Sequence, residues 1–207
     1  MSAYPIALDG ARVDAVIVGG GSVAERKAKA LLESGARVRI VASSPSAGVR
    51  VLAGERCTIE TRAFAPSDVS PDGTPGRTTL VIAATDRADV NARVVDAARA
   101  LGVLVNAADD PGAGTFVTLA THRAGDLVVA VTAGGVPGVA ARVRDAIGLR
   151  FDARYATAVS ALARLRRRLL DAGSRDEWRK ASASLVGETF CETVESGTFT
   201  QELAAWR

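Results

Sequence analysis

Residues 13–27 read VDAVIVGGGSVAERK, an apolar run that ends in three glycines and passes directly into a helical pattern. This order predicts a buried strand, a tight turn and a helix. Gly19, Gly21 and Ala24 have the G-x-G-x-x-A spacing of a dinucleotide fingerprint. Gly19 permits the turn, Gly21 lets the backbone approach a pyrophosphate, and Ala24 lets the helix pack on the strand. Because a helix that begins at Ser22 offers unpaired N–H groups and a partial positive charge, we expect phosphates to bind there.

The residues that follow complete one strand–helix–strand unit. An apolar stripe predicts a helix over 22–34, Gly35 ends it, and residues 37–42 alternate as a second strand would. Together these elements have the size of one βαβ motif, about 30 residues. The alternative is a glycine-rich turn that binds nothing. The surrounding pattern favours the dinucleotide site.

The end of the second strand lacks the acidic residue that holds the ribose of NAD in this type of fold. Ser43 and Ser44 stand there instead, and we expect their hydroxyl groups to bind the ribose. No arginine follows until Arg50, so this turn offers no obvious cation for the 2′-phosphate of NADP. The sequence therefore predicts NAD as the cofactor.

The composition of the 207 residues is that of an ordinary soluble protein, with 48% hydrophobic and 24% charged residues. No apolar run reaches the length of a membrane span and the start does not resemble a signal peptide, so we expect a cytoplasmic protein. Cys57 and Cys191 match no metal or redox spacing. The net charge of +3 suits an acidic small molecule, and no nucleic-acid or membrane-binding motif accompanies it.

Strands and helices alternate as far as Pro111. The patterns predict strands over 57–64, 79–84 and 103–106, a loop rich in proline and glycine over 66–76, and a helix over 88–101. Such alternation is typical of the α/β class and predicts a Rossmann-type parallel sheet.

The pattern changes after Pro111. Two apolar segments, 115–120 and 127–132, have no helix between them and predict an antiparallel hairpin with His122 in its turn. A loop over 134–138 and a helix over 139–149 follow, and the rest is helical, with breaks near Gly173, Gly187 and Gly197. We therefore predict three parts: a Rossmann domain over 1–111, a small α+β module over 112–150 and a helical region over 151–207.

Polar residues follow the predicted strands at the edge where open parallel sheets bind ligands. Thr85, Asp86 and Asn106 are expected to line the cofactor site there. Asp109 follows the strand expected near the nicotinamide, where a carboxylate can accept a proton or hold a metal ion. Alternatively, Asp109 or its neighbour Asp110 caps a turn.

The remaining histidine, cysteine and arginine residues do not predict a second catalytic site. The single histidine, His122, is expected to be an exposed turn residue, and neither a Ser-His-Asp nor a Cys-His arrangement can be assembled. No spacing predicts a metal site. The densest basic cluster is either a solvated helix face or a surface for an acidic ligand, and it consists of Arg164, Arg166, Arg167 and Arg168.

Four segments together resemble the precorrin-2 dehydrogenase family, which includes the N-terminal part of siroheme synthase and stand-alone dehydrogenase/ferrochelatases. They are residues 18–27, residues 31–36, residues 83–86 with Asn91, and residues 105–109. The resemblance covers about residues 5–150. Its most specific part is the Gly-x-Val-Ala-x-Arg-Lys extension that ends at Lys27.

The resemblance implies NAD-dependent oxidation of precorrin-2 to sirohydrochlorin, for siroheme or cobalamin synthesis. In several members the same site then inserts Fe²⁺, and Co²⁺ is a further candidate substrate. It also implies a homodimer formed through the small module after Pro111. By motif, the residues that contact NAD are Ser22, Val23, Ser43 and Ser44. Asp109 falls on the family's aspartate that is implicated in both reactions.

The residues agree with a polycarboxylate tetrapyrrole as ligand, because arginines such as Arg142 and Arg144 can clamp carboxylates. Two positions depart from the family. Pro137–Gly138 replaces a Ser-Pro pair, and Ala133 stands where some siroheme synthases have a phosphorylated serine. Two alternatives stay open: a non-enzymatic NAD-sensing or tetrapyrrole-binding module, and a chelatase that has kept only a relic of the cofactor loop.

Overall fold

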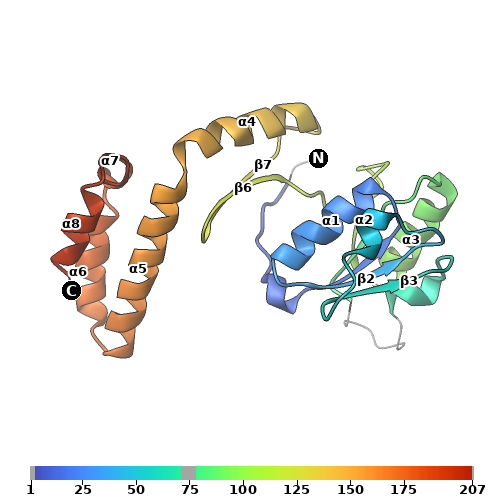
Figure 1. Ribbon diagram of the computed structural model, residues 1–207, viewed down its shortest axis with the longest axis horizontal. Helices are drawn as coiled ribbons and strands as arrows, with labels where there is room; N and C mark the ends of the chain where they lie inside the picture. The colour runs from blue at the N-terminus through green and yellow to red at the C-terminus, as the bar shows by residue number, and fades with distance from the viewer. Residues whose placement is uncertain (1–2, 71–77, 207) are drawn as a thin grey trace. The chain divides into compact units, whose positions relative to one another are not determined.

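The computed structural model describes residues 3–70 and 78–206 (Figure 1). The chain forms two compact units, Met1–Thr118 and Leu119–Arg207. Of the predicted loop over 66–76, residues 71–76 lie outside the described residues. This division into two units does not decide whether the chain has the three parts expected from the sequence, and the three-part division stays a prediction.

The first unit contains a five-stranded parallel sheet, as the sequence predicts. Its strand order is β3-β2-β1-β4-β5. The strands are β1 (Asp14–Val18), β2 (Arg37–Val41), β3 (Cys57–Glu60), β4 (Leu80–Ala83) and β5 (Leu104–Ala107). All four pairings are parallel. Every residue of β4 is buried, as expected for a continuous apolar strand covered on both faces. The Rossmann-type α/β fold is therefore confirmed.

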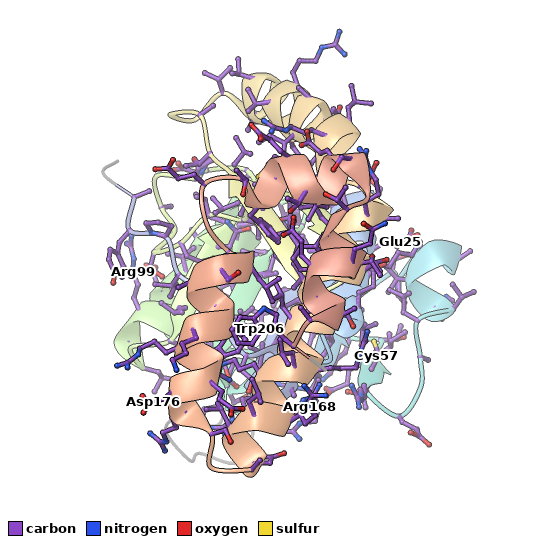
Figure 2. All side chains as sticks on the ribbon, turned by 90° about the vertical axis from the view of Figure 1, so that its left-hand side faces the viewer. Glu25, Cys57, Arg99, Arg168, Asp176 and Trp206 are labelled. Atoms are coloured by element: carbon purple, nitrogen blue, oxygen red, sulfur yellow. The ribbon has the colours of Figure 1, made fainter. Side chains whose placement is uncertain are left out.

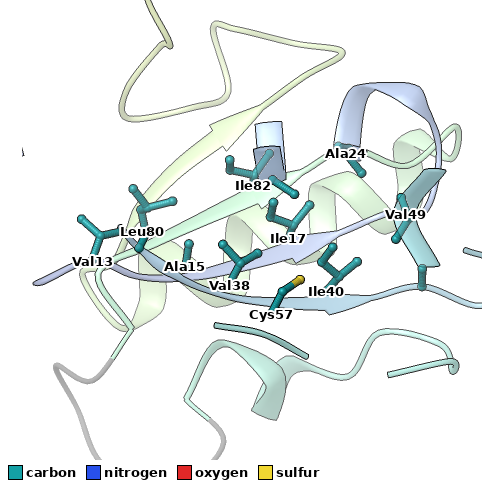
Figure 3. Packing of buried hydrophobic residues seen from close by; sticks show 14 residues of the cluster. Val13, Ala15, Ile17, Ala24, Val38, Ile40, Val49, Cys57, Leu80 and Ile82 are labelled. Atoms are coloured by element: carbon teal, nitrogen blue, oxygen red, sulfur yellow. The ribbon is translucent and has the colours of Figure 1, made fainter. Parts of the chain in front are cut away.

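Helices cover both faces of this sheet. α1 (Ser22–Glu33) packs Ala24 and Ala28 on one face, in a cluster with Ile17 and Ile40 (Figure 3). α3 (Ala88–Ala100) packs on the other face, in a second cluster that includes Val16, Val81, Val94 and Val95. Neighbouring residues of β1 thus point to opposite faces, as the pleat requires. Each fully buried Val or Ile contributes roughly 1.5–3 kcal/mol relative to an exposed one.

Shorter elements complete the first unit. Two 3-10 turns are η1 (Gly10–Arg12) and η2 (Pro66–Val69), and α2 (Ala47–Arg50) is a single helical turn. The side chain of Ser46 caps α2 by accepting a hydrogen bond from the Val49 N–H at 3.2 Å. α2 places Val49 in the same core cluster as Ile17, so it secures the loop that follows β2.

The second unit pairs a small hairpin with helices. β6 (Ala120–Ala124) and β7 (Leu127–Val131) are antiparallel. The helices are α4 (Pro137–Arg150), α5 (Ala153–Asp171), α6 (Arg175–Leu185), α7 (Phe190–Ser196) and α8 (Phe199–Ala204). The predicted helical remainder is confirmed. Its core contains Tyr155, Leu165, Leu185, Val194 and Phe199.

The predicted strand over 115–120 is wrong. The N–H groups of Thr115 and Phe116 instead donate to the carbonyl of Val105 at 2.7 and 3.3 Å. The hairpin turn is the two-residue step Gly125–Asp126, with Gly125 at φ +58°, and it pairs Ala124 with Leu127. A two-residue turn fixes which residues of the two strands pair, so the first strand of the hairpin must end directly before Gly125. His122 consequently lies in β6 and not in a turn.

Candidate functional site

A cavity of about 950 Å³ opens at the carboxyl ends of β1, β2 and β4, inside the first unit. This is the position at which open parallel sheets bind their ligands. It is lined by eight of the predicted cofactor residues: Gly19, Gly21, Ser22, Val23, Ser43, Ser44, Thr85 and Asp86. The structure therefore brings these residues, which come from three separate strand ends, into one site.

The glycine turn has the backbone geometry that a pyrophosphate site needs. Gly19 has φ +134°, and a Cβ there would collide with the carbonyl oxygen of Ala84. A Cβ on Gly20 would lie 2.7 Å from the carbonyl oxygen of Ser44. By contrast, a Cβ on Gly21 would have nothing within 4 Å, because this residue faces open space. The turn is thus tightly packed behind Gly21 and open in front of it.

The N-terminus of α1 points its donors toward this open space. Gly21 is the N-cap residue, and no side chain accepts a hydrogen bond at the cap. The first-turn N–H groups at Ser22 and Val23 therefore remain available to an anion, and the helix dipole favours a negative charge there. These observations fit the pyrophosphate of a dinucleotide.

The loop after β2 supplies two free hydroxyl groups. Ser43 and Ser44 are exposed and line the cavity, and neither side chain has a hydrogen-bond partner among the described residues. The backbone N–H of Ser46 donates to the carbonyl of Gly20 at 2.9 Å, which ties this loop to the glycine turn. The two hydroxyls are thus held beside the turn, as ribose binding requires.

The loop after β4 is built around a buried amide. Asn91 is 2% exposed, and its Oδ1 accepts from the backbone N–H and the hydroxyl of Thr85 at 3.1 and 2.7 Å. Its Nδ2 donates to the carbonyl of Thr85 at 3.1 Å. Thr85 therefore shapes the cavity wall and its hydroxyl proton is already engaged. Asp86 beside it is exposed and lines the cavity.

Sequence reasoning missed an ion-pair cluster at the rim, formed by Arg39, Glu60, Arg62 and Asp68. Arg62 lines the cavity and holds both carboxylate oxygens of Asp68, at 2.5 and 2.8 Å. It also pairs with Glu60, and Arg39 pairs with Glu60 at 3.2 Å and with Asp68 at 3.4 Å. Glu60 and Arg62 lie two residues apart in the sequence, but their partner Asp68 comes from η2.

Charge pairing decides the ionisation of this cluster. Burial by itself would raise the pKa of Asp68. The hydrogen bonds from Arg62 and from the Ala65 N–H, together with the charges of Arg62 and Arg39, outweigh burial and lower that pKa. The hydrogen bonds of Arg62 with Asp68 and Glu60 raise the pKa of Arg62. The guanidinium is therefore permanently charged, and two carboxylates balance it.

The structure places Asn106 outside the cavity. Asn106 is 4% exposed in β5, where its Oδ1 accepts from Lys27 Nζ at 2.7 Å and its Nδ2 donates to the carbonyl of Phe116 at 3.1 Å. Lys27 Nζ also donates to the hydroxyl of Thr118 at 3.1 Å. Lys27 ends the Gly-x-Val-Ala-x-Arg-Lys motif, and its spacing in the sequence indicates neither of these contacts.

The two aspartates after β5 have different environments. Asp110 accepts from the backbone N–H of Gly112 at 2.9 Å, so it is the one that caps the turn. Asp109 is exposed and lies outside the cavity lining, on the loop that follows the strand of Asn106. A ligand can reach its carboxylate, and its catalytic role stays a prediction.

His122 is half-buried in β6, and its Nε2 donates to the carbonyl of Phe151 at 2.6 Å, so the expectation of an exposed turn residue is wrong. The part of the chain that the structure describes has no group of three or more His, Cys, Asp or Glu suited to hold a metal ion. None of its helices is both long and apolar enough to cross a membrane.

The basic cluster of α5 is largely exposed. Arg164 donates to Ser160 Oγ at 2.8 Å, and Arg168 donates to the carbonyl of Trp206, beside which it lies (Figure 2). Arg166 and Arg167 are exposed. The observed geometry is that of a solvated helix face with a shallow depression of about 190 Å³ near Trp206.

Comparison with known proteins shows the family of this chain. The family model described as putative NAD(P)-binding matches residues 6–120. A siroheme synthase of Nitrosomonas eutropha is 34% identical over 95% of this chain and 41% of its own length. A siroheme synthase of Methylococcus capsulatus is 37% identical over 83% of this chain and 35% of its own length. This chain thus spans about two fifths or less of the length of these siroheme synthases.

A solved structure shows the same fold over almost the whole chain. It is a protein described as SirC, precorrin-2 dehydrogenase, with a TM-score of 0.75 and 21% sequence identity. The match covers 98% of this chain and 100% of that one.

Proposed function

This chain belongs to the putative NAD(P)-binding family, and on that premise we propose that it is an NAD-dependent dehydrogenase that oxidises precorrin-2 to sirohydrochlorin. The observation that carries the proposal is the cavity at the glycine turn, with its open helix N-terminus. The alignment with a siroheme synthase along 95% of the chain supports the choice of substrate. It also confirms the resemblance expected from the sequence.

In this proposal the bound NAD supplies the hydride acceptor for a ring carbon of the substrate. The first turn of α1, at Ser22 and Val23, binds the pyrophosphate through backbone N–H groups. Ser43 and Ser44 bind the ribose hydroxyls. Arg62 is already balanced by Glu60 and Asp68, so it is not free for the 2′-phosphate of NADP. That balance supports NAD over NADP.

Asp109 is proposed to act on the substrate. Its carboxylate is exposed, close in sequence to the end of β5, and not used in the turn that Asp110 caps. A carboxylate there can hold a pyrrole N–H and accept the proton that leaves with the hydride. The same carboxylate also orients the pyrrole relative to the cofactor.

The test follows precorrin-2 by absorbance in the presence of NAD. Asp109→Ala is expected to lower kcat by about 100-fold or more, the range of a lost general base, while the Kd of NAD stays unchanged. Asp110→Asn is the matched control, because the amide oxygen still accepts from Gly112. Wild-type protein that binds NAD but leaves precorrin-2 unchanged would reduce the function to NAD sensing or tetrapyrrole binding.

A chelatase step on the same substrate is part of the proposal. Fe²⁺ or Co²⁺ would enter as a substrate, and Asp109 is the carboxylate positioned to guide it. Sirohydrochlorin supplied with Fe²⁺ and no NAD should give siroheme in wild-type protein and not in Asp109→Ala. Metal insertion without any NAD-dependent oxidation would identify a chelatase alone.

We further propose a cytoplasmic homodimer. Cys57 and Cys191 are both free, in keeping with a reducing compartment. Within the second unit, α4 and β7 leave several large apolar side chains uncovered: Val128, Val136, Val139, Val143 and Leu149, between 43% and 85% exposed. An apolar surface of this kind marks a site of association, and a second copy would bury it.

A further inference from the structure

Lys27 occupies an unusual position in the first unit. It lies one helical turn after Val23, which lines the cavity, so both residues share one face of α1. Its Nζ donates to Asn106 Oδ1 at 2.7 Å and to Thr118 Oγ1 at 3.1 Å. Three segments that are distant in the sequence therefore meet at one ammonium group.

The orientation of this ammonium is well defined. Asn106 is 4% exposed, and its Nδ2 is engaged by the carbonyl of Phe116 at 3.1 Å, so its Oδ1 must face Lys27. Thr118 is exposed, so the hydrogen bond to its hydroxyl brings Nζ to the protein surface. An ammonium has three N–H donors, and these two acceptors use two of them.

The charge of Lys27 is not balanced. Both acceptors are neutral, and no ion pair within the described residues includes Lys27. Burial lowers the pKa of Lys27, and the positive charge of Arg26 lowers it further. Lys29, two residues later on the same helix, pairs with Glu25 at 2.6 Å. A half-buried cation costs free energy unless an anion accompanies it, and Lys27 lacks one.

We propose that Lys27 binds a carboxylate of the tetrapyrrole substrate, with Asn106 and Thr118 holding Nζ in position and leaving one N–H for the ligand. The inference rests on the proposed function, since it names how that substrate is held. The cofactor's pyrophosphate is the other anion available. Lys27 does not line the cavity of the glycine turn, so the substrate carboxylate is favoured. Lys27 lies on the side of β5, the strand that leads to Asp109.

The test compares Lys27→Met with Lys29→Met, which removes a charge of the same sign from an exposed, paired position. For Lys27→Met the KM of precorrin-2 should rise at least about tenfold, as expected for a lost hydrogen bond between charged groups. The kcat and the Kd of NAD by calorimetry should change little, whereas the melting temperature should fall, because the buried Asn106 Oδ1 loses its donor. Lys29→Met should leave all four unchanged, and Lys27→Arg should restore most of the KM.

Other outcomes overturn the inference. A rise in the Kd of NAD equal to the rise in KM would assign the charge to the cofactor. A fall in melting temperature with unchanged KM would leave Lys27 a purely structural residue.

A second measurement separates this inference from the proposed function. Sirohydrochlorin is titrated into the protein without NAD. The wild type can fail to oxidise precorrin-2 and still bind sirohydrochlorin more tightly than Lys27→Met does. That result would refute the dehydrogenase proposal and support the carboxylate site at Lys27. If the two proteins bind it equally, or neither binds it, the carboxylate site fails.

Discussion

β4 in the first unit and β7 in the second have nearly the same apolar composition but different surroundings. Leu80–Ala83 is buried at every residue, because α1 and α3 cover both faces of its sheet. Leu127–Val131 alternates between half-buried and exposed, and Val128 is 45% exposed. Composition alone therefore does not decide burial; the number of covering layers does. The parallel sheet of the first unit is covered on both faces, whereas the hairpin and α4 of the second unit leave apolar side chains exposed.

Replacing a glycine by alanine should give the largest difference in lost stability between the two units. Gly19→Ala should lower the free energy of unfolding of the first unit by about 4 kcal/mol, because strain at φ +134° adds to a collision with Ala84. NAD binding by calorimetry should be lost. Gly134→Ala in the second unit, at φ +55° with nothing near its Cβ, should cost about 1 kcal/mol.

The measurement can follow the units separately. Both tryptophans, Trp178 and Trp206, belong to the second unit, so their fluorescence in urea follows that unit, while circular dichroism follows the whole chain. Equal losses for the two glycine variants would contradict the idea that the glycine turn is closely packed and the loop at Gly134 is not.

A charge placed on the exposed apolar surface of the second unit should have the second-largest effect, on dimer formation. Val139→Asp on α4 should raise the dissociation constant of the dimer roughly a hundredfold, because each of two copies loses one buried apolar side chain. Sedimentation measures this, and circular dichroism should show an unchanged fold. Val51→Asp, in the first unit, is the control, since Val51 is 77% exposed. A monomeric wild type, or equal effects of both variants, would refute the dimer proposal.

Ion pairs give the smallest of the three effects. Asp68→Asn should lower the free energy of unfolding by about 2 kcal/mol at neutral pH, because it leaves Arg62 without its buried partner. Asp176→Asn, whose pair with Arg179 is exposed on the second unit, should leave stability unchanged within error. Urea denaturation measures both.

The contribution of Asp68 also has a defined pH dependence. Its pKa is lower in the folded protein than in the unfolded chain, where an aspartate titrates near about 3.9. The stabilisation is therefore present above that value and disappears as the pH falls through the folded pKa. Below about pH 4, the difference in free energy of unfolding between the wild type and Asp68→Asn should therefore shrink. Curves that stay parallel into acid would show that Asp68 is not the titrating group.

The sequence predicted most of the first unit, because the signals there are local. The glycine turn, the boundaries of α1 and the buried strands each depend on residues close together in the chain. The error at residues 115–120 arose where an apolar pattern did not say which partner it pairs with. Thr115 and Phe116 bond to Val105 instead, and the Gly125–Asp126 turn places the hairpin at residues 120–131.

The candidate site was predicted in the same uneven way. Eight of the nine expected cofactor residues line one cavity, because they sit at strand ends whose position follows from the fold class. Asn106 lies in β5, which contributes no residue to the cavity, and its side chain accepts a hydrogen bond from Lys27. Arg62 was missed because its partner Asp68 comes from a different loop.

The sequence by itself determined the parallel sheet, the glycine turn and the kind of ligand it can hold, because each follows from backbone freedom and apolar spacing within one short segment. Only the tertiary structure decided which charges are balanced and which are not. Pairing such as Arg62 with Asp68, and the isolation of Lys27 among neutral oxygens, depends on chain segments brought together from far apart. Electrostatic interactions act through space, so the sequence does not show which charges of distant segments will pair.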